Sequence, residues 1–252
     1  MKVAILAGGR GSRLGEAGSK SKAMIRIGDQ PILWHIMKYY GQYGFHDFVI
    51  ALGYQGDSIR NYFTETAARR PPSSNGAQTI CFPAAERDWT VELIDTGLDT
   101  MSGGRIKRLS PYLGRAPFML TWCDGLADVA LDQLRAFHER HGRIGTLTAV
   151  HPPGRFGRLD LAGDRIVAFR EKALDPNAWI NGAFFVFDAG IFGYIDGDAT
   201  QFEREPLERL AAEGQLMAYR HESFWQCMDT AKEAQTLNDI WREGAAPWKL
   251  WE

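Results

Sequence analysis

The chain has 252 residues, 45% hydrophobic and 24% charged, so it can bury a full core as one large α/β domain or two small ones. Its formal net charge of −2 gives no general attraction to nucleic acid or to an anionic membrane, and we expect neither as a partner. The three cysteines, Cys81, Cys123 and Cys227, form no Cys-x-x-Cys pair, which indicates reduced thiols and a cytoplasmic protein.

The first expected element is a strand from Val3 to Ala7, apolar enough to be buried on both faces of a parallel sheet. This run of five residues is too short for a signal peptide or a membrane span. The strand leads into residues 8–13, a loop of glycines and arginines, and Lys20 and Lys22 follow. Such a loop can turn its N–H groups toward an anion, which indicates a phosphate site. The alternative is a tight turn with solvated cations.

This loop fits neither of two better-known phosphate motifs. The P-loop requires Gly-Lys-Ser/Thr, whereas Lys20 follows Ser19 here. The dinucleotide fingerprint requires a third glycine where a helix opens, and Leu14 stands there instead. Both motifs are therefore disfavoured.

Helical and strand-like patterns alternate along the first two-thirds of the chain. They predict helices over 29–40, 57–68, 102–113, 131–141, 205–213 and 231–243, and strands over 47–53, 79–82, 89–94, 118–122, 144–150, 159–161, 166–169 and 179–187. Residues 69–76 have the composition of a surface loop. No linker or repeat divides the chain, so we expect one domain over 1–252. Its expected fold is a doubly wound, mostly parallel α/β sheet with an inserted mixed β section.

Two aspartates follow predicted strands late in the chain. Asp124 comes directly after the strand over 118–122, and Asp229 precedes the helix that starts at Ala231. Ligands of open parallel sheets bind at the carboxyl ends of the strands, where Mg²⁺ takes one or two carboxylates plus substrate phosphates. With the loop over 8–13, the pair fits metal-assisted transfer to or from a nucleoside triphosphate. Alternatively, Asp124 forms a turn and Asp229 caps a helix.

The segment 4–14, followed by Lys20-x-Lys22-x-Met24, resembles the signature of the sugar-1-phosphate nucleotidyltransferases. Further segments resemble one branch of that family, the glucose-1-phosphate cytidylyltransferases: 28–38, 95–108, 152–157, 180–186, 224–230 and 246–249. They span nearly the whole chain in the same order. The resemblance implies a Rossmann-like fold of the nucleotide-diphospho-sugar transferase type, and it suggests a homo-oligomer. Trp241, Trp248 and Trp251 either pack in the core or anchor a subunit contact.

The resemblance also implies a role for individual residues. Arg13 and Lys22 would be catalytic, and Asp124 and Asp229 would hold Mg²⁺. The nucleotide would contact Leu6, Ala7, Gly8, Gly9, Gly11, Ser12, Arg105 and Asp124, and the sugar phosphate would contact Glu171, Lys172, Asn181 and Gly182. Arg105 could instead lie on a helix surface.

The implied reaction transfers CMP from CTP to a sugar 1-phosphate, glucose 1-phosphate first among them, and releases pyrophosphate. A phosphate monoester is largely ionised near neutral pH, so its oxygen can attack the α-phosphorus without a general base. Catalysis then consists of positioning and of charge stabilisation by Mg²⁺, Lys22 and Arg13. No covalent intermediate is required, and we expect Cys123 to be a small buried residue.

Several positions depart from the family pattern. Ser21 and Ala23 replace the prolines beside Lys22, which should loosen that lysine without removing its charge. Likewise, Cys123 replaces a glycine, Ala173 replaces a proline and Ala183 replaces a glycine. These changes leave open another acceptor phosphate or another triphosphate.

Two other classes of protein remain as alternatives. A non-catalytic nucleotide- or sugar-binding regulator would be favoured by the loss of Lys22, Asp124 or Asp229, and all three are present. A nicotinamide oxidoreductase is disfavoured because the fingerprint is absent.

Overall fold

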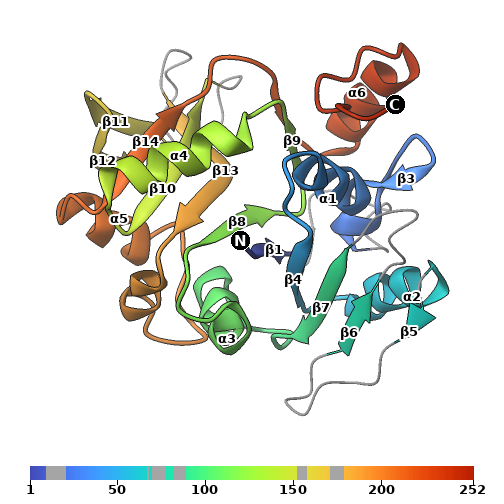
Figure 1. Ribbon diagram of the computed structural model, residues 1–252, viewed down its shortest axis with the longest axis horizontal. Helices are drawn as coiled ribbons and strands as arrows, with labels where there is room; N and C mark the ends of the chain where they lie inside the picture. The colour runs from blue at the N-terminus through green and yellow to red at the C-terminus, as the bar shows by residue number, and fades with distance from the viewer. Residues whose placement is uncertain (10–20, 67, 70–77, 82–88, 152–157, 171–178) are drawn as a thin grey trace.

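Among the residues that the structure describes, eleven strands form a mixed sheet at the centre of the protein (Figure 1). The computed structural model describes residues 1–9, 21–66, 68–69, 78–81, 89–151, 158–170 and 179–252. The strand order is β11-β12-β14-β10-β13-β8-β1-β4-β7-β6-β5. These strands are β1 (Val3–Leu6), β4 (Asp47–Leu52), β5 (Ala68–Arg69), β6 (Gln78–Cys81), β7 (Thr90–Asp95), β8 (Phe118–Trp122), β10 (Gly145–Val150), β11 (Arg158–Ala162), β12 (Arg165–Arg170), β13 (Ile180–Phe187) and β14 (Leu216–Arg220).

The middle of the sheet is parallel. β1 pairs in parallel with β4 on one side and β8 on the other, and β7 extends the parallel set beyond β4. On the far side of β8, β13 pairs antiparallel with it. Beyond β13 the sheet continues in the order β10, β14, β12 and β11. The expected mixed β section is therefore an extension of the main sheet, and the predicted α/β fold class is confirmed.

Helices cover both faces of the sheet because its central strands are apolar on both faces. Val3 and Ile5 of β1 belong to the core under α1 (Ile32–Gln42), α2 (Gly56–Thr66), α4 (Leu131–His141) and α6 (Ala231–Arg242). Ala4 and Leu6 belong to the opposite core, under α3 (Ser102–Leu113) and α5 (Glu205–Ala212). Successive strand side chains point to opposite faces, so a fully apolar strand requires both helical layers.

The helix predicted over 57–68 ends early. It stops at Thr66, and β5 then pairs antiparallel with β6 in the register Ala68↔Cys81. The expectations of helix at Ala68 and loop at Arg69 are therefore wrong. Pairing with a strand distant in sequence outweighs a weak local helical preference.

The shortest elements were not predicted. Two small sheets consist of β2 (Arg26–Ile27) with β3 (Gln30–Pro31), and of β9 (Gly125–Ala127) with β15 (Trp225–Cys227). The 3₁₀ turns η2 (Lys22–Met24) and η3 (Ala189–Tyr194) were also missed, as was one longer strand, the five-residue β14. Strands of two or three residues are too short to display a periodic pattern.

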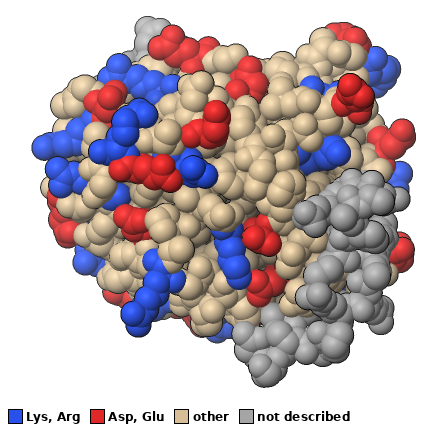
Figure 2. Space-filling view, in the orientation of Figure 1, with Lys and Arg blue, Asp and Glu red and all other residues tan. Residues whose placement is uncertain are grey.

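The surface carries both signs of charge. On the face in Figure 2, Lys and Arg are mixed with Asp and Glu, in keeping with the net charge of −2. No helix among the described residues is long and apolar enough to cross a membrane.

Candidate active site

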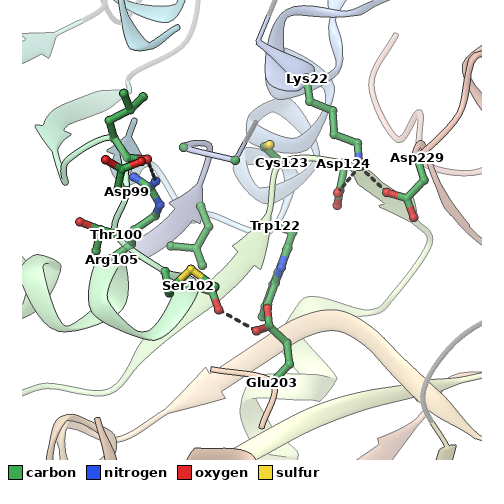
Figure 3. Close-up of a pocket in the computed structure, with 15 residues that line it drawn as sticks. Lys22, Asp99, Thr100, Ser102, Arg105, Trp122, Cys123, Asp124, Glu203 and Asp229 are labelled. Carbon is green, nitrogen blue, oxygen red and sulfur yellow. Dashed lines mark hydrogen bonds and ion pairs between the residues drawn. The ribbon is translucent and has the colours of Figure 1, made fainter. Parts of the chain in front are cut away.

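A cavity of about 650 Å³ opens at the carboxyl ends of β1 and β8 (Figure 3). Its walls come from the ends of those strands, the loop after β7, the start of α3 and the segment that leads into α5. The lining residues are Leu6, Gly8, Gly9, Lys22, Leu98, Asp99, Thr100, Met101, Ser102, Arg105, Trp122, Cys123, Asp124, Glu203 and Asp229. The cavity therefore lies where parallel sheets bind ligands.

The small sheet of β9 and β15 brings Asp124 and Asp229 together. Asp124 lies between β8 and β9, and Asp229 follows β15 after one intervening residue. β9 pairs antiparallel with β15 in the register Gly125↔Cys227, and the Met228 N–H donates to the Asp124 carbonyl over 2.7 Å. Two carboxylates about a hundred residues apart in sequence thus face one cavity.

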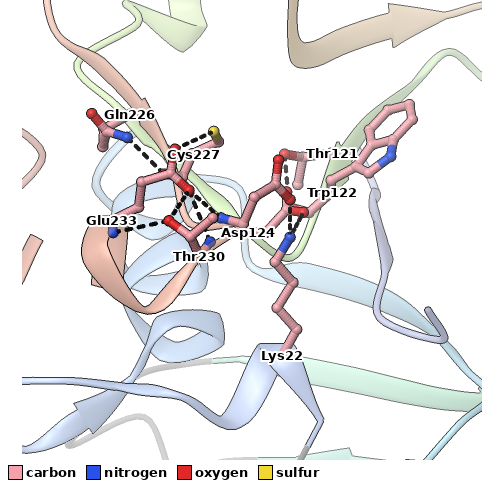
Figure 4. Close-up of polar contacts among 9 residues, drawn as sticks. Lys22, Thr121, Trp122, Asp124, Gln226, Cys227, Thr230 and Glu233 are labelled. Atoms are coloured by element: carbon pink, nitrogen blue, oxygen red, sulfur yellow. Dashed lines mark hydrogen bonds and ion pairs between the residues drawn. The ribbon is translucent and has the colours of Figure 1, made fainter. Parts of the chain in front are cut away.

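Asp229 lies just before α6 but does not cap it. Thr230 is the N-cap residue, and its side chain forms a capping box with Glu233 (Figure 4). The Glu233 carboxylate also accepts the Asp229 N–H over 2.8 Å. The helix start is therefore satisfied by Thr230 and Glu233, which leaves the Asp229 carboxylate for the cavity. The helix-cap alternative for Asp229 is wrong.

Lys22 joins the two aspartates. Its Nζ donates to Asp124 Oδ2 over 2.6 Å and to Asp229 Oδ1 over 2.5 Å, as Figure 3 shows. Burial lowers the pKa of Lys22, but the charges and hydrogen bonds of Asp124 and Asp229 outweigh it and raise that pKa above its ordinary value. Lys22 therefore carries a full positive charge at neutral pH.

The turn that presents Lys22 keeps a proline-like backbone despite the missing prolines. The Met24 N–H donates to the Ser21 carbonyl over 2.8 Å, and Ser21 has a φ of −53°, within the range that proline adopts. Whether the substitutions loosen Lys22 stays a prediction.

The aspartate pair fits a divalent cation. Asp124 and Asp229 converge on one point, because a single ammonium group already bonds to both. Among the residues that the structure describes, no cluster of three or more His, Cys, Asp or Glu could hold a metal ion. A cation at this pair would therefore complete its shell with water and substrate oxygens, which is how Mg²⁺ is commonly bound beside phosphates.

Arg105 lies against Gly8 of the cavity wall and is 5% exposed. Its Nη1 donates to the Leu52 and Gly97 carbonyls and to Thr96 Oγ1, the last over 2.7 Å. A Cβ atom at Gly8 would lie 2.3 Å from Arg105 Nη1, so glycine is required there to admit the guanidinium group. Arg105 thus anchors the loop after β7, and the helix-surface alternative is wrong.

Cys123 is buried beside the carboxylates. Burial, followed by the charge of Asp124, raises the pKa of its thiol to about 12. The thiol is therefore protonated at neutral pH and unsuited to act as a nucleophile, in agreement with the expectation of a small buried residue.

Asn181 and Gly182, predicted to bind the sugar phosphate, are not among the cavity-lining residues. Asn181 Oδ1 accepts the Ala183 N–H over 2.8 Å, and the Gly182 carbonyl accepts Trp225 Nε1–H over 2.7 Å. Ala183 occupies the left-handed region at a φ of +61°. In the structure both residues lie on β13, where Asn181 bonds within the strand and Gly182 bonds to Trp225 of β15.

The remaining site predictions divide into three groups. Leu6, Gly8, Gly9 and Arg105 line the cavity, whereas Ala7 is buried beside it. Gly11, Ser12, Arg13, Glu171 and Lys172 lie outside the described residues. Sequence reasoning missed Trp122, Ser102 and Glu203; the motif over 95–108 pointed toward Ser102, but no signal marked Glu203.

Comparisons with known proteins identify relatives of this chain. A family model of MobA-like NTP transferase domains matches residues 3–86. Glucose-1-phosphate cytidylyltransferase of Salmonella typhimurium is 43% identical over all of both chains, and a probable glucose-1-phosphate cytidylyltransferase of Bacillus subtilis is 37% identical, also over all of both chains. A mannose-1-phosphate guanyltransferase of Aspergillus fumigatus is 26% identical, over 94% of this chain and 63% of its own.

Solved structures share the fold. HddC from Yersinia pseudotuberculosis has a TM-score of 0.77 at 20% identity, covering 95% of this chain and 99% of its own. A UDP-glucose pyrophosphorylase complexed with UDP-glucose has the same TM-score at 14% identity, over 96% and 98% of the two chains. At such identities the likeness supports the fold alone. The full-length sequence match is far closer, and it shows that the chain belongs to the glucose-1-phosphate cytidylyltransferase family of nucleotidyltransferases.

Proposed function

We propose that the protein transfers CMP from CTP to glucose 1-phosphate and releases pyrophosphate. The observation that carries this proposal is the cluster of Lys22, Asp124 and Asp229 in a cavity at the carboxyl ends of parallel strands. The choice of CTP and glucose 1-phosphate rests on the activity for which the relative that is 43% identical over the full chain is named.

The reaction is an in-line displacement at the α-phosphorus of CTP. A phosphate oxygen of glucose 1-phosphate forms the new P–O bond, and the bond from the α-phosphorus to the leaving pyrophosphate breaks. The attacking monoester is already ionised, so no side chain has to remove a proton. The protein has to align the two phosphates and offset their negative charge.

Lys22 is suited to offset that charge because it is cationic and borders the cavity. Asp124 and Asp229 would hold Mg²⁺, which supplies charge neutralisation and orientation of phosphate oxygens when bound. We infer that Lys22 exchanges partners. It neutralises the two carboxylates in the free protein, and it would turn to phosphate oxygens of the substrate when the carboxylates hold a cation. Arg13, outside the described residues, would add a second positive charge.

We also propose that the enzyme acts in the cytoplasm as a homo-oligomer. Cys123 and Cys227 are buried, and neither is in a disulfide within the described part of the chain, which suits a reducing compartment. Trp248 is fully buried and Trp251 packs against the same core, so the C-terminal tryptophans belong at least in part to the protomer's own interior. Light scattering coupled to size-exclusion chromatography measures the oligomeric state, and a monomer at working concentration would contradict this proposal.

A matrix of four nucleoside triphosphates against several sugar phosphates, with pyrophosphate release as the readout, tests the function. We expect the highest kcat/KM for CTP with glucose 1-phosphate in the presence of Mg²⁺. A better acceptor in the panel would replace glucose 1-phosphate in the proposal. No release from any pair, by protein shown to be folded, would overturn it.

A further inference from the structure

Two segments distant in sequence meet at one part of the cavity wall, away from the Lys22 cluster. Ser102 begins α3, and Glu203 lies on the segment before α5. Ser102 Oγ donates to Glu203 Oε2 over 2.6 Å. Figure 3 shows this pair separated from Lys22, Asp124 and Asp229, with Trp122 between them. The cavity thus has a carboxylate at a second place, distinct from the aspartate pair.

Three hydrogen-bond donors on this part of the wall already have partners. The N–H groups of Met101 and Gly103 donate to the Asp198 and Thr200 carbonyls over 2.8 and 2.9 Å. The Ser102 hydroxyl gives its proton to Glu203 and accepts the Phe202 N–H over 2.9 Å. The start of α3 is therefore anchored to the segment before α5, and its hydroxyl has no second proton to offer.

The Glu203 carboxylate, in contrast, retains capacity to accept. Ser102 bonds to Oε2, and no residue that the structure describes donates to Oε1. A carboxylate can accept several hydrogen bonds, and the Ser102 hydroxyl restricts how this one turns. A half-buried, oriented acceptor in a ligand cavity favours a ligand group that donates, such as an amine, and disfavours a carbonyl oxygen.

We propose that Glu203, oriented by Ser102, accepts a hydrogen bond from the 4-amino group of cytosine and so selects CTP over UTP. This inference rests on the proposed function. If the triphosphate lies at Lys22, Asp124 and Asp229, the base of the same nucleotide must reach another part of the cavity, and this wall offers a partner for it. Carboxylates pair with the cytosine amine in nucleic-acid recognition for the same reason.

The same geometry disfavours uracil. Cytosine and uracil differ on this ring edge in that an amino group replaces a carbonyl oxygen and N3 loses a proton. The uracil O4 would face a carboxylate with no proton to share, and both acceptors would lose water without gaining a bond. Sites built around such a hydrogen bond reject the analogue that lacks it by large factors.

The principal test is Glu203→Gln, assayed with CTP and with UTP at saturating acceptor. The glutamine oxygen can still accept from Ser102, while its amide can donate to the uracil O4. We expect the ratio of kcat/KM for CTP to that for UTP to fall by at least about tenfold, with the unfolding temperature unchanged. An unchanged ratio in folded protein would overturn the proposal, because it would leave Glu203 with an anchoring role alone.

Asp99 provides a matched control, since its carboxylate also lines the cavity and is exposed. Asp99→Asn should leave the CTP-to-UTP ratio unaltered, whatever it does to the overall rate. A fall in the ratio with Asp99→Asn and none with Glu203→Gln would assign the base to the other carboxylate and contradict the proposal.

A second measurement needs no variant. The triphosphate of 2-pyrimidinone riboside lacks the 4-amino group but is otherwise built like CTP. We expect the wild-type protein to bind it at least about tenfold more weakly than CTP in equilibrium titrations without acceptor. Equal affinity would overturn the proposal. Wild-type protein that turns over no triphosphate would instead refute the proposed function, so the two failures are distinguishable.

Discussion

Two polar clusters among the described residues differ in charge: one is ionised, and the other is neutral. In the cavity, Lys22, Asp124 and Asp229 are charged and partly exposed, with side-chain accessibilities of 13%, 21% and 19%. Between α4 and β10, His138, His141 and Thr146 form a second cluster, in which His138 is 3% exposed and Thr146 is fully buried.

The histidine cluster is a directed chain of hydrogen bonds. The Arg143 N–H donates to His141 Nδ1, so the His141 proton lies on Nε2 and is donated to Thr146 Oγ1 over 2.7 Å. The Thr146 hydroxyl then donates to His138 Nδ1 over 2.9 Å. The remaining His138 proton lies on Nε2, which is 3.7 Å from Asp188 Oδ1. Each of these three side chains keeps its donor and acceptor roles only while both imidazoles are neutral.

The difference in charge between the two clusters corresponds to a difference in role: the first serves the proposed reaction, and the second stabilises the fold. Charge is kept beside the cavity, where a ligand can replace one partner by another. Neutral groups with defined partners are placed in the packed interior, where an uncompensated charge would be costly. Variants in the first cluster should therefore affect turnover with little loss of stability, and variants in the second should do the reverse.

The largest expected effect is that of Asp124→Asn on turnover. We expect pyrophosphate release from CTP and glucose 1-phosphate to fall about 1,000-fold, since the neutral amide is a poor ligand for Mg²⁺. The unfolding temperature should change little because Asp229 still pairs with Lys22. Asp196→Asn, at an exposed aspartate away from the cavity, is the control. Near wild-type turnover by Asp124→Asn would refute the metal assignment.

Lys22→Met should separate catalysis from cation binding. We expect turnover to fall roughly 100-fold, because a positive charge near the phosphates is lost. Binding of Mn²⁺ without nucleotide should tighten by about tenfold, because the competing ammonium is gone. Electron paramagnetic resonance titration measures the latter, and Lys232→Met on the exposed face of α6 is the control. Weaker Mn²⁺ binding by Lys22→Met would contradict the partner exchange.

In the second cluster, Thr146→Val should cost stability and spare activity. The change preserves shape but leaves two imidazole nitrogens without their partner, which should lower the free energy of unfolding by about 1–3 kcal/mol. Denaturant titration at pH 7.5 measures this, and the specific activity of the folded fraction should equal that of the wild type. Loss of activity without loss of stability would contradict the assignment of this cluster to stability.

The same cluster predicts a dependence of stability on acid. Burial lowers the pKa of His138, and burial, then the nearby charges, lower that of His141 from 6.5 to about 4. The unfolded chain therefore binds more protons in this range, and the free energy of unfolding should fall as the pH decreases from about 6.5 toward 4. Denaturant titrations across that range test this, and stability that rises on acidification would contradict it.

The smallest expected effect is at Ala183, whose φ of +61° is strained for a residue with a Cβ atom. Ala183→Gly should relieve that strain and raise the free energy of unfolding by about 0.5–1 kcal/mol, after the added entropy of the unfolded chain. Ala149→Gly in β10 is the contrasting control, which should destabilise the protein. Destabilisation of both variants to the same extent would show that the positive φ carries no strain.

The sequence could predict the parts of this molecule that local patterns encode. The apolar run at Val3 predicts a central strand, and an aspartate after another such run, Asp124, predicts a ligand at the sheet edge. Lys22 was singled out by its resemblance to a family motif, and the structure brings it into contact with both aspartates, while its catalytic role stays a prediction.

What could not be predicted depends on contacts between distant segments. Ser102 and Glu203 are 101 residues apart, and nothing in either local sequence links them. The need for glycine at position 8 arises from Arg105, which approaches from another element, so the glycine alone could not reveal it. The pairing of β9 with β15, which joins the aspartates, involves three-residue strands without a periodic signal.

The central claim is that the charged cluster serves nucleotidyl transfer, and product analysis tests it most directly. Wild-type protein is incubated with CTP, glucose 1-phosphate and Mg²⁺, and the products are quantified by ³¹P nuclear magnetic resonance. The account predicts CDP-glucose and pyrophosphate in equal amounts. Pyrophosphate accompanied by CMP instead of the nucleotide sugar, or no turnover by folded protein, would contradict it.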